Sequence, residues 1–474
     1  MKLKLSEIAE IIGAAGGVAE REVEGYSIDS RTLAAGQLFF AIQGPHFDGH
    51  DFVGQAIERG AAGAVVSSAF REQATSELTP LLLAVADPLK ALQDLARAVR
   101  RKWGRRVVAI TGSTGKTTTK ELMAAILAGK FSVLKSPGNL NNYYGLPLTL
   151  LALEPSHEVA VVELAMSAPG EIALLAQIAE PQVGVVTNVA PAHLQFFDSL
   201  DGIANAKREL IENLTPPAAA VLNFDDERVR RFAEGFDGQV ISYGSGEGAL
   251  FRLVEWQAMN AVGSQFRVKA PGYVHQFTLP LVGRHNAQNA LAAIAAASLF
   301  KVAPNEIAAA LAKRPDLHQR SEVLTLPGEI TTLNDCYNSN PVAMERMVET
   351  LAAWPNARRR IVVAGEMLEL GTHATELHRN VGRKCAESGV DWLLAVQGAA
   401  RFLVEGAVSA GLPAGRAEFF MTTEEAADRL LELLQPGDVV LVKGSRGVHL
   451  ERVIELLQSS GEASSAAKEM KRSS

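Results

Sequence analysis

The segment VVAITGSTGKTTTKE, Val107–Glu121, constrains the fold of this chain more than any other. The run RVVAI is continuously apolar, which is typical of a strand buried on both faces of a parallel sheet. The following TTTKELMAAILAG has the pattern of a helix, with Gly129 placed to end it. A glycine-rich loop between a strand and a helix closes backbone N–H groups around phosphate oxygens. The segment therefore predicts a doubly wound α/β domain that binds a nucleotide.

The spacing of this loop is unusual. Ile110 stands where the common phosphate-binding loop has its first glycine, and Gly112 and Gly115 bracket only two residues. Lys116 is expected to reach the β- and γ-phosphates of ATP, and the Thr117 hydroxyl to ligate Mg²⁺. The alternative is a turn rich in small residues with an exposed lysine. The predicted phosphate contacts are Gly112, Ser113, Thr114, Gly115, Lys116, Thr117 and Thr118.

Alternating strand-like and helical runs divide the 474 residues into three α/β domains. We expect a small N-terminal α/β domain at 1–102 and a central P-loop ATPase-like domain at 103–315. After about residue 245 the central pattern becomes antiparallel. A C-terminal Rossmann-like domain is expected at 316–458, followed by a small, polar and disordered tail at 459–474.

Composition narrows the class of protein. The net charge of −7 argues against a general nucleic-acid binder. The two cysteines, Cys336 and Cys385, make neither a disulfide framework nor a metal cluster and fit the reducing cytoplasm. The N-terminus does not have the pattern of a signal peptide, and no apolar run is long enough to cross a bilayer, so we expect no membrane insertion.

Other polar residues follow the predicted strands, where open α/β sheets bind ligands. Glu163 ends VAVVEL and His193 follows VGVVTNV, so both are candidate metal ligands, although either alone is also a common structural residue. Lys207, in a charged helix, has the pattern of a solvated lysine. Asn286 and Asn289 lie three apart on one helix face and could contact a base or sugar, or act as an N-cap and a buried amide.

Three loops of the expected C-terminal domain also directly follow predicted strands. NDCYNSNP (334–341) is either a plain turn or a ligand loop, and GEMLELG (365–371) and KGSRG (443–447) follow two other strands. Loops at one sheet edge are expected to converge on one ligand.

The chain resembles the Mur ligases in the order of its motifs. These motifs are ITGSTGKTTTKE, VVEL, TNVAPAHL, the alanine-lysine pair at Lys207, HNAQNALAA and DCYNSNP. These enzymes form amide bonds at the expense of ATP in peptidoglycan precursor synthesis, and the shortened loop is a mark of the family. The segments DCYNSNP, GEMLELG and SPGNLNNYYGLPLTLL resemble the members that add the final dipeptide. The segments SIDSR and GQLFFAIQGPHFDGHDF resemble the uridine-diphosphate-binding domain of the members that add either the third residue or the final dipeptide. Gln195 stands where the family commonly has a glutamate.

The resemblance implies a cytoplasmic, monomeric ligase that joins D-alanyl-D-alanine to UDP-N-acetylmuramoyl-tripeptide through an acyl phosphate, with ATP and Mg²⁺ as cofactors. It implies catalytic roles for Lys116, His193 and Lys207, the last carbamylated as a Mg²⁺ ligand with Thr117, Glu163 and His193. Further ATP contacts are implied at Asn286, Asn289, Arg320, Asp335 and Asn338. Substrate contacts are implied at Ser30, Arg31, Asp48, Gly49, His50, Asn142, Tyr337, Asn340 and Lys443. The open alternatives are a Mur ligase that adds the third amino acid and a generic P-loop NTPase or kinase.

Overall fold

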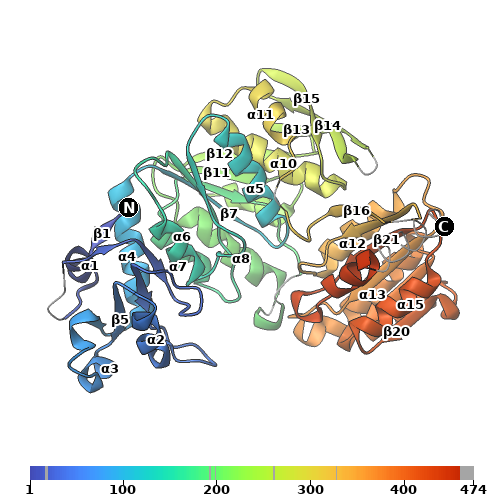
Figure 1. Ribbon diagram of the computed structural model, residues 1–474. Coiled ribbons are helices and arrows are strands. Elements are labelled where there is room, and N and C mark those ends of the chain that lie inside the picture. Colours follow the sequence, from blue (N-terminus) through green and yellow to red (C-terminus); the bar gives the residue numbers. More distant parts are fainter. Residues whose placement is uncertain are drawn as a thin grey trace, which may run out of the picture.

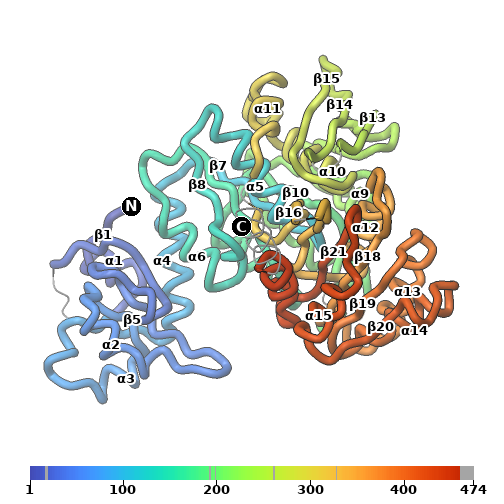
Figure 2. The backbone as a smooth tube through the Cα atoms, turned by 45° about the vertical axis from the view of Figure 1, so that its right-hand side comes forward, coloured from blue at the N-terminus to red at the C-terminus, as the bar shows by residue number. Residues whose placement is uncertain are grey.

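The computed structural model describes residues 1–15, 20–191, 194–197, 199–259, 262–315, 317–326 and 328–459. The chain forms three α/β domains, and in both views the central domain lies between the other two (Figure 1; Figure 2). The predicted α/β class and three-domain organisation are therefore confirmed. Of the predicted disordered tail, only Ser459 lies within the described residues, at the end of a helical segment, 451–459.

The N-terminal domain is a parallel sheet with helices around it. Its four strands pair in the order β3-β4-β5-β6. Helix α4 begins after Asp87, whose carboxylate accepts the Leu89 N–H, and ends at Gly104 with φ 70°. This helix packs against two helices of the central domain, so the two domains share one hydrophobic core. The elements are β1 (Leu3–Lys4), α1 (Leu5–Ile12), β2 (Glu22–Val23), β3 (Gly25–Ser27), β4 (Gln37–Phe40), α2 (Val53–Glu58), β5 (Gly63–Ser67), α3 (Ser68–Gln73), β6 (Leu82–Val85) and α4 (Pro88–Trp103).

The central domain holds a nine-stranded sheet in the order β15-β14-β13-β12-β11-β10-β7-β9-β8. Along this order, every neighbouring pair from β8 to β13 is parallel. The pairs β13-β14 and β14-β15 are antiparallel, as the pattern after residue 245 predicts. Its strands are β7 (Arg106–Thr111), β8 (Val133–Lys135), β9 (Val159–Glu163), β10 (Val183–Val186), β11 (Ala219–Asn223), β12 (Gln239–Gly244), β13 (Phe251–Ala258), β14 (Ser264–Ala270) and β15 (Tyr273–Leu279). Its helices are α5 (Lys116–Ala128), α6 (Gly145–Leu151), α7 (Glu171–Ala179), α8 (Leu200–Glu212), α9 (Glu227–Arg230), α10 (Arg284–Ala297) and α11 (Pro304–Leu311).

Strand β7 shows why the apolar run before the loop is continuous. Val107 and Ala109 pack in the core shared with the N-terminal domain, whereas Val108 and Ile110 pack in the core under α5 and α10. All four side chains are fully buried. Both faces of β7 are therefore covered, and the glycine loop is held at the end of a rigid central strand.

The C-terminal domain is a six-stranded sheet in the order β16-β17-β21-β18-β19-β20, parallel except for β16. Its elements are β16 (Glu322–Leu326), β17 (Ile330–Asn334), α12 (Pro341–Ala352), β18 (Arg360–Gly365), α13 (Ala374–Glu387), β19 (Trp392–Val396), α14 (Arg401–Ser409), β20 (Ala417–Phe420), α15 (Thr423–Leu433) and β21 (Val439–Lys443). Among the described residues, no helix of the three domains is long and apolar enough to cross a membrane.

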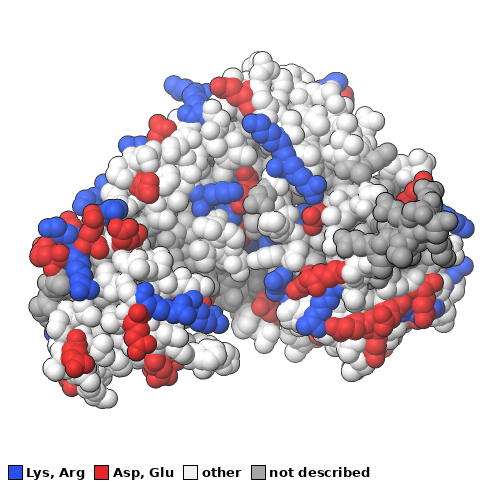
Figure 3. Space-filling view, viewed as in Figure 1, with Lys and Arg blue, Asp and Glu red and all other residues white. Residues whose placement is uncertain are grey.

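The surface charge is mixed. On the face shown in Figure 3, Lys and Arg alternate with Asp and Glu over the N-terminal domain, and acidic side chains gather on the lower part of the C-terminal domain. This face therefore carries charges of both signs and not one broad basic patch.

Candidate active site

Two glycines fix the shape of the phosphate loop. Gly112 has φ 148° and Gly115 has φ 81°, and both values disfavour residues with a side chain. A Cβ at Gly112 would lie 1.8 Å from the Thr187 hydroxyl, and one at Gly115 would lie 2.2 Å from Asn289 Oδ1. The loop is thus pressed against the end of β10 and against α10. Glycine is required at these two positions, although the earlier glycine of the common loop is replaced by Ile110.

Residues that directly follow strand β10 form hydrogen bonds with the phosphate loop. Asn188 Oδ1 accepts hydrogen bonds from the Thr114 N–H at 3.0 Å and from the Thr114 hydroxyl at 3.1 Å. The Asn188 amide donates back to the Thr114 carbonyl at 3.1 Å, and the Thr187 hydroxyl donates to the same carbonyl at 2.6 Å. The sequence reasoning did not identify these two residues. Their position directly after a predicted buried strand was the available signal.

Lys116 begins helix α5 and lies half-buried against the loop. Its ammonium group donates to the Gly112 carbonyl at 2.7 Å. Burial lowers the pKa of Lys116, the Glu163 carboxylate opposes that shift, and the nearby Arg320 guanidinium adds to it. The chain therefore holds a half-buried lysine at the point where phosphate oxygens would lie.

A carboxylate and a hydroxyl meet beside Lys116. The Thr117 hydroxyl donates to Glu163 Oε2 at 2.8 Å, and the Asn141 amide donates to Glu163 Oε1 at 2.8 Å. Glu163 is only 2% exposed. Mg²⁺ in nucleotide sites takes one or two protein oxygens together with phosphate oxygens, so this pair fits the predicted ion. His193, the other predicted metal ligand, lies outside the described residues.

Lys207 lies inside helix α8, and its pattern-based interpretation as a solvated lysine is wrong. The residue is 2% exposed. Burial lowers the pKa of Lys207 well below its usual value, and the charge of nearby Lys116 contributes to the shift. Helix α8 buries the stripe Ile203, Ala204, Ala206, Lys207, Leu210 and Ile211, and the lysine falls on that stripe. The helical spacing from Ile203 to Lys207 to Leu210 was the signal that could have found it.

The C-terminal domain contributes a second charged group. Lys443, at the end of β21, is 2% exposed and lies 2.5 Å from Asp335 Oδ2. Its ammonium group also donates to the Asn338 carbonyl at 2.9 Å. The Arg320 guanidinium lies over the Tyr337 ring, 4.0 Å from its centroid. The loops after β17 and β21 therefore do converge.

The two asparagines of α10 are buried and bonded to neighbours. The Asn286 amide donates to the Val282 carbonyl at 2.8 Å and to the Ser321 hydroxyl at 3.1 Å. The Asn289 amide donates to Asn286 Oδ1 at 3.2 Å. Since the N-cap of α10 is Gly283, Asn286 is not a helix cap. Asn286 thus connects the first turn of α10 with the start of the C-terminal domain.

One cavity of about 270 Å³ joins these groups across the central and C-terminal domains. Of the predicted site residues it is lined by Ser113, Thr114, Gly115, Lys116, Thr117, Thr118, Glu163, Asn286, Asn289, Arg320, Asp335, Tyr337, Asn338, Asn340 and Lys443. It also includes Arg346 and His285, which the sequence reasoning did not name. Gly112, Asn142 and Lys207 do not line it, and Asn340 additionally caps α12 by accepting the Ala343 N–H.

Asn142 has a local structural contact. Its side-chain oxygen accepts the N–H groups of Tyr144 and Gly145 at the start of α6.

The substrate residues predicted in the N-terminal domain form two separate groups outside this cavity. Arg31 donates to the Asp29 carboxylate from Nε and Nη2, which lowers the pKa of the Asp29 carboxyl to about 2. The Arg31 side chain is 83% exposed. The Ser30 hydroxyl donates to Gln55. His50 accepts the Ser67 N–H on Nε2, so Nδ1 carries the proton and donates to Asp48 at 2.6 Å.

Gly49 completes the second group. A Cβ at Gly49 would lie 2.6 Å from the Ile42 nitrogen, so the backbone approaches closely there.

Comparison with known protein families matches all three domains. The model described as "Mur ligase family, catalytic domain" matches residues 22–100, and "Mur ligase middle domain" matches 110–297. The model described as "Mur ligase, glutamate ligase domain" matches 319–446.

Individual relatives match along almost the whole chain. The UDP-N-acetylmuramoyl-tripeptide–D-alanyl-D-alanine ligase of Bacillus subtilis is 32% identical, over 96% of this chain and 98% of its own length. The crystal structure of MurF from Acinetobacter baumannii superposes with a TM-score of 0.88 at 30% identity and covers 97% of this chain and 99% of that chain. The MurF ligase from Thermotoga maritima in complex with ADP superposes with a TM-score of 0.81 at 29% identity, over 93% and 98% of the two chains. This chain belongs to the Mur ligase family.

Proposed function

We propose that this chain is an ATP-dependent ligase that joins D-alanyl-D-alanine to the terminal carboxylate of UDP-N-acetylmuramoyl-tripeptide. The products are UDP-N-acetylmuramoyl-pentapeptide, ADP and phosphate, and the pathway is peptidoglycan synthesis. The observation that carries the proposal is the single cavity where the phosphate loop of the central domain meets Asp335 and Lys443 of the C-terminal domain. The relatives that match the whole chain and carry this name support it.

The phosphate loop would bind the ATP phosphates. Lys116 neutralises charge on the transferring phosphoryl group, and backbone N–H groups at the start of α5 bind its oxygens. Glu163 and the Thr117 hydroxyl would hold Mg²⁺, which when bound neutralises the β- and γ-phosphates. His193 is proposed as a further metal ligand.

The chemistry needs two steps. The carboxylate oxygen of the tripeptide attacks the γ-phosphorus, and ADP leaves, which gives an acyl phosphate. The neutral amine of D-alanyl-D-alanine then attacks the acyl carbon, and the resulting tetrahedral intermediate expels phosphate. Each amide bond therefore consumes one ATP, and the phosphate retains one oxygen of the original carboxylate.

Lys207 is proposed to be carbamylated. Because burial lowers its pKa, the folded protein favours the neutral amine, which is the form that adds to carbon dioxide. Addition and loss of a proton give a carbamate anion, whose negative charge would lie near the Lys116 ammonium group. The product is a carboxylate-like group of the kind that Mg²⁺ prefers.

The predicted domain roles and boundaries remain part of this proposal. The N-terminal domain, with Ser30, Arg31, Asp48, Gly49 and His50, would bind the uridine diphosphate end, and Asn142 would contact the same substrate. Tyr337, Asn340 and Lys443 would contact the dipeptide or the nucleotide from the C-terminal side. The chain would act as a monomer in the cytoplasm, where ATP is available and where its two free cysteines, both buried, stay reduced.

Two other functions are less well supported. A ligase that adds the third amino acid would use the same cavity with another amine, and a generic NTPase would need no partner substrates. The names of the full-length relatives disfavour the first, and the Mur ligase match over all three domains disfavours the second.

The test is phosphate release from ATP with UDP-N-acetylmuramoyl-tripeptide and D-alanyl-D-alanine added singly and together. The proposal predicts sustained release only with both, and a pentapeptide product by mass spectrometry. Release with the UDP-tripeptide and a different amine would change the assigned member of the family. Release with neither substrate would support the NTPase, and Lys116→Met serves as the inactive control.

A further inference from the structure

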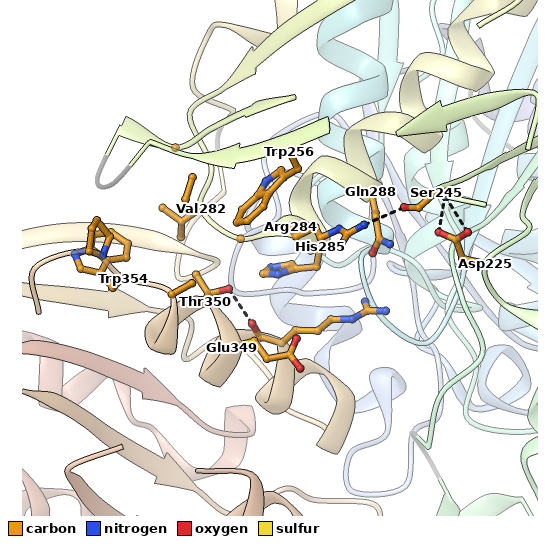
Figure 4. A pocket seen from close by; sticks show the side chains of 16 residues that line it. Asp225, Ser245, Trp256, Val282, Arg284, His285, Gln288, Glu349, Thr350 and Trp354 are labelled. Atoms are coloured by element: carbon orange, nitrogen blue, oxygen red, sulfur yellow. Dashed lines mark hydrogen bonds between the residues drawn. The ribbon is translucent and has the colours of Figure 1, made fainter. Parts of the chain in front are cut away.

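A second cavity lies beside the nucleotide cavity, also between the central and C-terminal domains (Figure 4). Its volume is about 540 Å³, which is within the range of small-molecule sites. Strand β13 and the start of α10 line it from the central domain, and α12 with the turn that follows lines it from the C-terminal domain. The ligase mechanism proposed above gives this cavity no role.

The walls of this second cavity are aromatic. Trp256 comes from β13 and Trp354 follows α12, so the two rings belong to different domains (Figure 4). The Trp256 indole N–H is buried and has no hydrogen-bond partner in the described structure. His285 also lines the cavity, and burial, followed by the charge of Arg346, lowers the pKa of His285 to about 4. Two indoles and a neutral imidazole form a surface on which a planar ring can stack.

The two carboxylates of the cavity are already balanced. The Asp225 carboxylate accepts the N–H groups of Ser245, at 2.7 and 2.8 Å, and of Gly246 at 3.1 Å. Glu349 pairs with Lys384 at 2.9 Å. Each carboxylate thus already has a partner, and the Glu349 charge also acts on the Arg346 guanidinium.

In the described part of the chain, the two arginines of the cavity donate hydrogen bonds only to hydroxyl groups. Arg284 donates to the Ser245 hydroxyl at 3.4 Å, and Arg346 donates to the Thr114 hydroxyl at 3.0 Å. Among the described residues, no ion pair is formed by either guanidinium. Arg346 is half-buried, and desolvation lowers its pKa although the charges of Glu349 and Asp226 oppose that shift, so a closer anion would be favourable. Both groups are thus available to a carboxylate or phosphate, which arginine binds with two parallel hydrogen bonds.

We infer that this cavity binds a small planar anion, whose ring packs against Trp256 and Trp354 and whose carboxylate or phosphate group is held by Arg284 and Arg346. The ligand would touch both domains at once, so its binding favours the domain arrangement seen here.

The second cavity is linked to the first through shared residues. Arg346 and His285 line both cavities, and Arg346 contacts Thr114 of the phosphate loop. An anion in the second cavity competes with Thr114 for the Arg346 guanidinium and so changes the affinity of the loop for a nucleotide. By linkage, a nucleotide changes the affinity for the anion by the same factor. This coupling rests on the proposed function of the nucleotide cavity; the site itself does not.

Tryptophan indole N–H signals in NMR spectra test the site. The chain has four tryptophans, and Trp103 and Trp392 lie outside the cavity as internal controls. The probe is 2-naphthoate, with Trp256→Phe and Trp354→Phe used to assign the signals. We expect saturable shifts of the Trp256 and Trp354 signals only. The Arg284→Met variant should weaken binding about tenfold, the worth of a hydrogen bond to a charged group, whereas the exposed Arg401→Met should not.

Three results would overturn the site. One is the absence of saturable shifts up to the solubility limit of the probe. Another is equal shifts of all four signals, which indicate adventitious binding. The third is equal affinity for the neutral analogue 2-naphthylmethanol, which would show that the anionic group contributes nothing to binding.

The coupling is tested by repeating the titration with saturating ADP and Mg²⁺. We expect the affinity for 2-naphthoate to change about fivefold or more, with the reciprocal change in ADP affinity by calorimetry. The Arg346→Met variant should abolish that change. ADP binding without any change in naphthoate affinity would overturn the coupling, whereas a failure of ADP to bind at all would refute the proposed function and leave the anion site standing.

Discussion

Replacing Lys116 by methionine should lower the catalytic activity without lowering the stability of the fold. The side chain keeps its length and loses its charge. A phosphoryl oxygen held about 4 Å from the ammonium group gains about 4 kcal/mol at an effective dielectric constant of about 20. If this interaction strengthens in the transition state, its loss lowers kcat/KM by a factor of about 10³.

The same substitution is expected not to destabilise the fold. Burial lowers the pKa of Lys116, so below the folded pKa the charged group costs folding free energy; this cost begins to fall as pH rises through the folded pKa and is gone only above the unfolded pKa. Methionine removes this cost, although the hydrogen bond to the Gly112 carbonyl is lost with it. The variant should therefore unfold at the same temperature as the wild type or a higher one.

The assay is phosphate release with both substrates, together with thermal unfolding followed by circular dichroism. Lys269→Met, an exposed lysine on β14, is the matched control and should keep full activity. A variant at Lys116 that retains a third of the wild-type activity would refute the electrostatic reasoning. Loss of activity together with a lower unfolding temperature would refute the stability argument.

Four further predictions follow from single contacts. Glu163→Gln should raise the Mg²⁺ concentration needed for half-maximal activity by at least about tenfold, measured by magnesium titration, and an unchanged requirement would exclude Glu163 as a ligand. Lys207→Ala should lose activity and recover part of it with added acetate, which replaces the proposed carbamate; recovery by chloride alone would contradict that role. Because the folded pKa of His285 lies below the unfolded value, its contribution to stability falls between pH 6.5 and about 4, by up to about 3 kcal/mol. His285→Gln should flatten that part of the pH–stability curve in urea titrations, and parallel curves would count against it. Asp438 is fully buried and paired with Arg359 at 2.9 and 2.5 Å, so Asp438→Asn should cost about 3 kcal/mol in the free energy of unfolding, and a loss no larger than that of an exposed variant such as Asp428→Asn would be evidence against a buried pair.

The sequence predicts those site residues that lie at or just after the ends of strands. Lys116 and Glu163 follow or end apolar runs that form neighbouring strands of the central sheet, whose parallel strands bring such positions to one edge. Lys443 ends a strand of the C-terminal sheet in the same way, and all three residues line one cavity. The fold class follows from the same alternation of strands and helices. The family resemblance then supplied roles that periodicity alone does not.

Contacts between domains were beyond sequence reasoning. Arg346 lies on an ordinary amphipathic helix, and nothing in its neighbourhood along the chain indicates that it reaches Thr114 in another domain. Trp256 and Trp354 are far apart in sequence and meet at one cavity only after the central and C-terminal domains pack. Asn188 supports the loop through side-chain bonds that a strand-end asparagine need not make.

The most direct test of the account is an isotope experiment. UDP-N-acetylmuramoyl-tripeptide is prepared with ¹⁸O in its terminal carboxylate and converted with ATP and D-alanyl-D-alanine. An acyl phosphate predicts that each phosphate released carries one ¹⁸O atom from that carboxylate, as read by mass spectrometry. Phosphate without the label would contradict acyl-phosphate formation and with it the proposed ligase mechanism.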